Sequence, residues 1–173
     1  MSDCCATEPA ALTHAVAKCL ECGEAGQPVA TITLKLMVRP QFLEAVGKPG
    51  FRFCRSPDCD VVYFHPDGRQ LRKGDLRVRV GVKETEDPVP LCYCFGFTRA
   101  MAVEEIQATG GCTIPARIAA EVRAGNCACE ARNPQGSCCL GQVAAAIKRL
   151  LNSPAPRQQV PLTGNILRHA DKP

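Results

Sequence analysis

The sequence predicts an α+β protein built from two small units, a β-rich unit followed by an all-α unit. Segments rich in β-branched and aromatic residues lie in the first half of the 173 residues, whereas alanine-rich segments with helical spacing fill the second half. Thirteen cysteines occur, and closely spaced pairs are found in both halves. We therefore expect domains at residues 1–83 and 91–152, a charged, proline-containing linker at 84–90 and a disordered tail at 153–173.

Three segments of the first half have the pattern of strands. Residues 30–36 alternate polar and apolar side chains, which is the period of a half-buried strand. Residues 60–64 are β-branched and aromatic and end at a Pro-Asp-Gly turn, and residues 76–82 alternate again. These patterns predict that the first unit is mostly β.

The second half contains three predicted helices with recognisable ends. Thr98 can cap the first helix, and Gly110 can end it. Thr113 can cap the second helix, which is expected to end at Gly125. The third is expected over residues 140–151, with one apolar stripe that would face inward: Val143, Ile147 and Leu150.

The first group of cysteines predicts a structural zinc site. Cys19 and Cys22 form a C-x-x-C pair, and Cys54 and Cys59 form a second pair with a wider spacing. Four thiolates suit tetrahedral Zn²⁺, and a filled shell of four sulfurs leaves no position for a reactive water. Predicted strands on both sides would make this unit similar to a zinc ribbon. The alternative is a free redox dithiol at Cys19 and Cys22, with the other two cysteines as core thiols.

The second group offers six cysteines for the four ligand positions of an iron–sulfur centre. Cys92 and Cys94 are two residues apart, so their side chains can leave an extended loop on the same side and share one iron. Side chains adjacent in sequence diverge, so only one of Cys138 and Cys139 is expected to be a ligand. Cys139 is in line with Val143 on the inward stripe, at a helix N-terminus that would stabilise its thiolate.

This region resembles the bacterioferritin-associated ferredoxin family, in which a C-x-C pair, a helix-turn-helix and a further cysteine pair hold a [2Fe–2S] cluster. Here thirty-two residues separate Cys94 from Cys127. Four stretches look more specifically like the N-terminal module of CopZ-type copper chaperones: residues 92–98, 113–120, 123–127 and 136–139. In that module a zinc domain precedes a ferredoxin-like domain, and the resemblance covers roughly residues 15–152.

The resemblance implies a set of [2Fe–2S] ligands: Cys92, Cys94, Cys127 and Cys139. An insert at residues 128–138 departs from the simpler ferredoxins, so Cys129 and Cys138 remain alternatives. CopZ-type chaperones bind Cu⁺ through a separate C-terminal domain, and nothing after Leu151 matches it, so we expect that domain to be absent. The cysteines outside the two sets could offer Cu⁺ soft ligands, although packed or exposed thiols are the simpler interpretation: Cys4, Cys5, Cys112, Cys129 and Cys138.

The function that the resemblance implies is one-electron transfer linked to copper homeostasis, with reduction of Cu(II) to Cu(I) as the specific hypothesis. The alternative is a docking or regulatory module that passes electrons to a ferritin-like protein or an oxidoreductase. The expected partner is a metal-handling or redox protein, such as a copper chaperone domain, a copper ATPase or a reductase. The sequence has no catalytic triad, phosphate-binding glycine loop or activated nucleophile, so we do not expect an enzyme.

Charge and terminal sequence bear on nucleic acids and on location. The formal net charge of +4 counts every cysteine as neutral, and two metal–thiolate centres would bring the loaded protein close to zero. A zinc-ribbon nucleic-acid binder is therefore not expected. The start Met-Ser-Asp-Cys-Cys lacks the features of a secretory signal, and the chain has no long apolar run. We expect a cytoplasmic protein without membrane insertion, whose cysteines bind metals and do not form disulfides.

Overall fold

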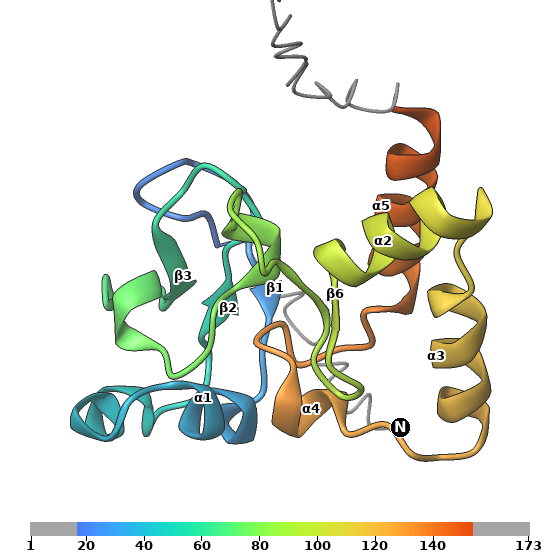
Figure 1. Ribbon diagram of the computed structural model, residues 1–173. Helices are drawn as coiled ribbons and strands as arrows, with labels where there is room; N and C mark the ends of the chain where they lie inside the picture. The colour runs from blue at the N-terminus through green and yellow to red at the C-terminus, as the bar shows by residue number, and fades with distance from the viewer. Residues whose placement is uncertain (1–16, 154–173) are drawn as a thin grey trace, which may run out of the picture.

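The structure is a computed structural model that describes residues 17–153. The first half contains an antiparallel sheet with the strand order β1-β2-β3-β4 and one helix, α1, beside it (Figure 1). Their bounds are β1 Gln27–Pro28, α1 Thr31–Met37, β2 Arg52–Phe53, β3 Val61–Phe64 and β4 Gln70–Arg72. Predictions for residues 1–16 and 154–173, including Cys4, Cys5 and nearly all of the tail, lie outside the described residues.

The second half contains four helices and a small hairpin of two strands. Figure 1 shows α2, α3 and α5 grouped on one side of the molecule, with α4 between them and α1. The bounds are β5 Pro90–Cys92, β6 Phe97–Thr98, α2 Arg99–Thr109, α3 Ile114–Arg123, α4 Cys129–Arg132 and α5 Leu140–Asn152. Four single-turn 3₁₀ helices complete the fold: η1 Pro40–Phe42, η2 Glu44–Val46, η3 Lys73–Asp75 and η4 Gly81–Lys83. The predicted α+β class is confirmed.

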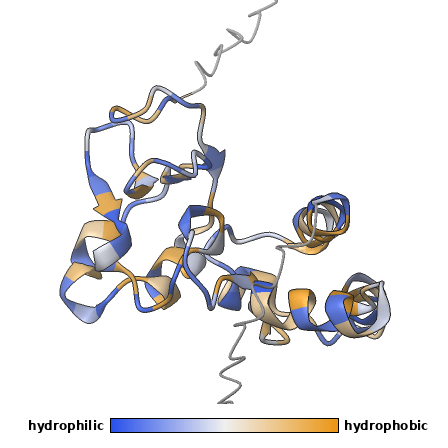
Figure 2. Ribbon diagram, turned by 45° about the horizontal axis from the view of Figure 1, so that its top comes forward, coloured by the Kyte–Doolittle hydropathy of each residue, from blue (hydrophilic) through white to orange (hydrophobic). Residues whose placement is uncertain are grey.

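Two apolar cores hold the two halves, and a third cluster surrounds the first cysteines. The first core packs α1 against the sheet through side chains that include Leu34, Phe53 and Tyr63. The second packs α3 and α5 through Ile118 and Val143, among others. Figure 2 shows hydrophobic and hydrophilic residues alternating along the helices, and in α3 and α5, but not in α2, the two kinds separate onto opposite sides. No helix among residues 17–153 combines the length and the hydropathy needed to cross a bilayer.

The three long helices were predicted correctly because their end signals are local. The Thr98 hydroxyl accepts a hydrogen bond from the Met101 N–H at 3.3 Å, and Gly110 ends α2 in the left-handed conformation with φ 75°. Thr113 precedes α3 as expected, but its side chain does not cap that helix. Its hydroxyl instead donates to the Glu105 carboxylate at 2.6 Å, which ties α2 to the start of α3.

The prediction of a strand over residues 30–36 was wrong, because these residues form helix α1. The buried positions are Thr33, Leu34, Met37 and Val38, which is a helical spacing. Ile32 and Leu36, which alternation would have placed on the same face as Leu34, are 49% and 43% exposed. Packing against the sheet outweighs the weak β preference of such a short alternating segment.

The prediction of a strand over residues 76–82 was also wrong. Apart from one isolated bridge between Leu76 and Val38, this segment has no partner strand and ends in η4. The alternation does predict burial, since Leu76 and Val80 are buried and Arg77 and Arg79 are exposed. Arginine side chains replace the ladder: the Arg77 guanidinium donates to the Val38 carbonyl at 2.7 Å. Alternating burial does not by itself produce a strand, because a hydrogen-bonded ladder also requires a neighbouring strand.

The insert at residues 128–138 joins the two halves. The Tyr63 hydroxyl of β3 donates to the Pro134 carbonyl at 2.6 Å, and the Thr33 hydroxyl of α1 donates to the Glu130 carbonyl at 2.7 Å. Asn133 and Gln135 of the insert are buried. The predicted domain boundaries at 84–90 stay a prediction, but the insert extends from the second half onto the first.

We expect Tyr63→Phe to lower the free energy of unfolding by about 1–3 kcal/mol, because the buried Pro134 carbonyl loses its donor. Burial raises the pKa of Tyr63, so this hydroxyl is protonated and remains a donor at neutral pH. Urea unfolding at neutral pH measures the change. An unfolding midpoint equal to that of the wild type would show that this contact does not hold the halves together.

Candidate metal centres

The first four cysteines converge at one end of the sheet. Their Sγ atoms all lie within 4.8 Å of one another, and this is the one group of that kind found among residues 17–153. The Cys19–Cys59 and Cys22–Cys54 sulfur distances are 3.9 and 3.5 Å. Zinc–sulfur bonds of about 2.3 Å in a tetrahedron require sulfurs of about this separation. The sequence grouping of these four thiols is therefore reproduced in space.

Two tight loops present these thiols. In the first loop the Cys19 N–H donates to the Glu24 carbonyl, and Gly23 takes φ 74°, so the chain turns back directly after Cys22. In the second loop Cys54 follows β2, and Cys59 lies just before β3. Pairing of β2 with β3 therefore brings Cys54 and Cys59 to the same end of the sheet, despite the four residues between them.

Burial and local hydrogen bonds set the acidity of these thiols. Desolvation raises the pKa of Cys54 to about 12, although a backbone hydrogen bond from Ser56 and the Lys83 ammonium both lower it. Desolvation acts in the same direction on Cys22, but hydrogen bonds from the Glu24 backbone and from Cys54 outweigh it and lower the pKa of Cys22. Without metal, Cys54 is therefore a neutral thiol at pH 7, and binding of a divalent ion must release protons.

The second group of cysteines forms pairs and not one tight cluster. The Cys94 and Cys129 sulfurs are 3.8 Å apart, and the Ala128 N–H donates to the Cys94 sulfur at 3.4 Å. Cys92 and Cys139 are buried in the same apolar cluster. Burial, followed by the neighbouring Cys92 thiol, raises the pKa of Cys139. Of the two candidates, Cys129 is the one whose sulfur contacts that of Cys94, so the geometry favours it over Cys127 as the neighbour of Cys94.

The predicted difference between Cys138 and Cys139 is confirmed in their exposure. Cys139 is 4% exposed and directly precedes α5, whereas Cys138 is exposed to solvent. Burial raises the pKa of Cys139, so desolvation outweighs the helix dipole that we expected to stabilise its thiolate. Its neighbour Val143 is buried on the same side of α5, as the stripe predicted.

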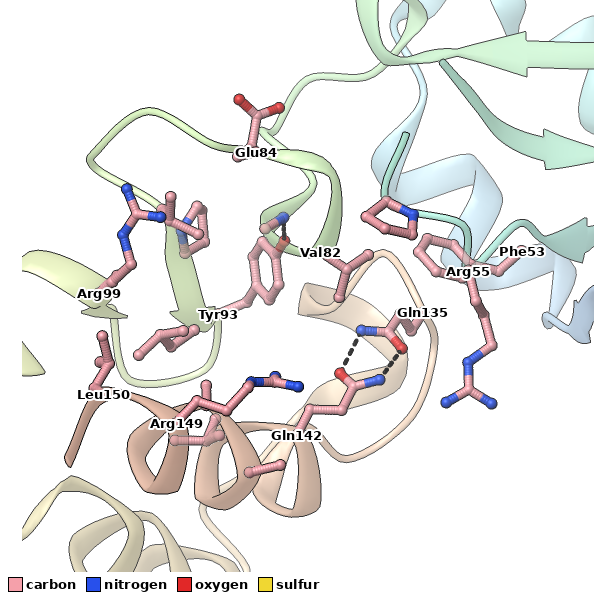
Figure 3. A pocket seen from close by; sticks show the side chains of 18 of the residues that line it. Phe53, Arg55, Val82, Glu84, Tyr93, Arg99, Gln135, Gln142, Arg149 and Leu150 are labelled. Atoms are coloured by element: carbon pink, nitrogen blue, oxygen red, sulfur yellow. Dashed lines mark hydrogen bonds between the residues drawn. The ribbon is translucent and has the colours of Figure 1, made fainter. Parts of the chain in front are cut away.

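A cleft with a volume of 640 Å³ is lined by Tyr93, which lies between Cys92 and Cys94, and by residues of the insert and of α5 (Figure 3). Two of its lining residues are hydrogen-bonded to each other, Gln135 from the insert and Gln142 from α5. Each amide donates to the other at 2.7 Å. This doubled contact fixes the insert that carries Cys129 against the helix that begins after Cys139. The sequence does not point to Gln135, because a single glutamine in an irregular segment has no recognisable pattern.

Comparison with known proteins agrees with this arrangement. A CopZ family model, described as a zinc binding domain, matches residues 16–77. The solved structure of the Archaeoglobus fulgidus CopZ N-terminal domain superposes with a TM-score of 0.63 at 34% sequence identity, over 75% of this chain and 96% of that one. The chain belongs to the CopZ family.

A curated CopZ relative gives the extent of the match. The copper chaperone CopZ of Archaeoglobus fulgidus is 36% identical over 124 residues, which is 70% of this chain and 57% of that protein. The chain thus matches little more than half the length of that CopZ protein. The predicted zinc-binding domain is confirmed, as is the CopZ resemblance itself.

Proposed function

We propose that this CopZ-family chain binds one Zn²⁺ and one [2Fe–2S] cluster and transfers single electrons in copper handling. The observation that carries the proposal is the contrast between its two groups of thiols. One is a compact group of four sulfurs. The other contains a close pair, Cys94 and Cys129, and two thiols buried in one apolar cluster, Cys92 and Cys139. A single tetrahedral ion takes four ligands around one point, whereas a two-iron cluster takes two thiolates on each iron.

The proposed zinc ligands are Cys19, Cys22, Cys54 and Cys59. Three of these thiols are buried, and their four sulfurs leave no position for an attacking water, so the ion has a structural role. The proposed cluster ligands are Cys92, Cys94, Cys129 and Cys139. This set adopts Cys129 in place of Cys127, because Cys129 is the thiol that approaches Cys94.

A bound [2Fe–2S] cluster supplies one-electron chemistry. The chain's own residues position the thiolates and control access to them. Cys92 and Cys139 are buried, whereas Cys94 and Cys129 are partly exposed, so one side of the centre lies near the surface. The Arg132 guanidinium donates to the Cys94 carbonyl at 3.0 Å and holds the exposed side of the C-x-C turn. An exposed edge permits electron exchange with a dissolved copper ion or with a partner.

Metal analysis tests the cofactor assignment. Protein purified without oxygen should contain one zinc, two irons and two acid-labile sulfides per chain, with the visible absorption of an oxidised [2Fe–2S] centre. A colourless, iron-free but folded preparation would contradict the proposal.

The copper step has its own test. Protein reduced with dithionite and freed of excess reductant is mixed with one equivalent of Cu(II) under argon. One electron should pass to copper, so the oxidised visible spectrum should return as a Cu(I)-specific chelator develops colour. Cys139→Ser protein, which retains zinc and most thiols, controls for reduction of copper by thiols. A cluster that stays reduced would contradict the role in copper reduction.

Substitution at Cys127 and Cys129 tests the fourth cluster ligand. We expect Cys129→Ser to lose most of the visible absorption, because one iron would lose one of its two thiolates. Cys127→Ser should keep the absorption. The two residues lie two positions apart and are both partly buried, so each variant is a matched control for the other. The opposite result would assign the position to Cys127.

A further inference from the structure

Lys83 is the one buried lysine, arginine or carboxylate side chain among residues 17–153, with 4% of its surface exposed. Its ammonium donates to the Ser56 carbonyl at 2.7 Å and to the Cys59 carbonyl at 2.9 Å. Both carbonyls belong to the loop that presents Cys54 and Cys59. The Lys83 side chain therefore extends from η4, between the two halves, to the backbone of the loop that carries two thiols of the first group.

No acidic side chain of the described part compensates this buried charge. The six ion pairs found within residues 17–153 all involve other residues. A buried ammonium with only carbonyl partners is unfavourable unless an opposite charge lies close by. Four thiolates around a divalent ion leave a net charge of roughly −2, and the Lys83 ammonium lies against the loop that carries two of them.

The turn that carries Lys83 also contacts the segment of the second thiol group. A Cβ on Gly81 would lie 1.9 Å from the Pro90 carbonyl oxygen, so only glycine lets η4 pack this closely on β5. The Gly81 N–H donates to the Tyr93 hydroxyl at 2.8 Å, and this hydroxyl donates to the Arg79 carbonyl at 3.0 Å. Figure 3 shows the Tyr93 ring reaching this turn.

Tyr93 is the central residue of the Cys92-Tyr-Cys94 segment. Cys92 ends β5, and Tyr93 begins the turn that follows. The Tyr93 ring packs on η4, whereas Cys92 is buried in one cluster with Cys139 and Cys94 lies near Cys129, so the ring leaves both cysteines free for the cluster position. A continuous series of contacts thus runs from the Cys54–Cys59 loop through Lys83 and Gly81 to Tyr93.

We infer that Lys83 is a positioning residue for the zinc centre, and that η4 and Tyr93 couple this centre to the cluster loop, so that an ordered zinc site slows loss of the cluster. The inference rests on the proposed function. Lys83 holds the second zinc loop and supplies a compensating charge. Tyr93 connects η4 to the C-x-C turn, so a displacement of η4 also displaces this turn.

The first test compares Lys83→Met with Lys73→Met, which removes an exposed lysine of η3. Competition with a chromogenic chelator should show a zinc affinity about 10–100-fold lower for Lys83→Met and unchanged for Lys73→Met. In protein loaded with Co²⁺ in place of zinc, the thiolate-to-cobalt charge-transfer bands should shift for Lys83→Met alone, because the nearby positive charge is gone. Wild-type affinity and bands in Lys83→Met would overturn the positioning role.

The second test measures coupling as the rate at which visible absorption is lost in excess iron chelator. Lys83→Met touches no cluster thiol but should speed this loss roughly three- to tenfold. Tyr93→Phe, which keeps the ring and removes the hydroxyl, should do the same at unchanged zinc affinity. In the double variant the two effects should not add, since both break one series of contacts.

The outcomes separate this inference from the proposed function. Wild-type protein without iron or zinc would contradict the proposed cofactors. Wild-type protein with both metals, combined with unchanged cluster loss in Tyr93→Phe, would overturn the coupling alone. Tyr93→Phe also keeps the coupling testable if Lys83→Met does not fold, because Tyr93 lies outside the zinc loops.

Discussion

Cys54→Ser is expected to abolish zinc binding and to unfold the sheet around it. Cys54 is fully buried in a cluster that consists of three cysteines, Val61 and Phe64. This end of the sheet has few apolar side chains, so bound zinc supplies a large part of the stability that an apolar core would otherwise give. Structural zinc contributes about 10–16 kcal/mol to folding in zinc-finger peptides, which equals or exceeds the total stability of about 5–15 kcal/mol of an ordinary domain.

Zinc content and far-ultraviolet circular dichroism measure this loss, and a strong zinc chelator added to the wild type should reproduce it. The control is Cys112→Ser, which changes a partly buried thiol outside both groups and should shift the unfolding midpoint only slightly. A Cys54→Ser protein with the wild-type midpoint would show that the sheet is stable without the ion.

Cys139→Ser is expected to abolish the visible absorption of the cluster, whereas Cys138→Ser is expected to leave it intact. The two residues are adjacent, yet Cys139 is buried beside Cys92 and Cys138 points to solvent. An iron that loses one of its two protein thiolates has only a hydroxyl in exchange, which is a poor ligand for this centre.

Iron content, visible absorption and the electron paramagnetic resonance signal of the reduced protein measure this prediction. Zinc content should stay at the wild-type level in both variants, because the first thiol group is separate. Loss of the cluster in Cys138→Ser with retention in Cys139→Ser would reverse the ligand assignment.

Features set by neighbours in the chain were predictable. The C-x-x-C pair, the Thr98 cap, the Gly110 helix end and the inward side of α5 depend on residues within about one turn or loop. Spacing likewise grouped Cys19 with Cys22 and Cys54 with Cys59, and the folded chain brings these four sulfurs together. Four short stretches, residues 92–98, 113–120, 123–127 and 136–139, were also sufficient to suggest the CopZ family.

Features set by distant contacts were not predictable. Residues 30–36 alternate like a strand but fold as α1, because the sheet buries the face formed by Leu34 and Met37. Residues 76–82 alternate correctly in burial but have no neighbouring strand to complete a ladder. A periodic pattern reports which side chains are buried, and the partner that buries them decides the backbone conformation.

The same distinction applies to the two candidate centres. The types and spacings of the cysteines were enough to predict metal–thiolate centres in both halves, since that chemistry belongs to the residues themselves. The packing of the insert determines that Cys129 approaches Cys94, and the position of η4 determines that Lys83 is buried against the Cys54–Cys59 loop. Both results depend on contacts between segments far apart in the chain, whose free energies no local pattern contains.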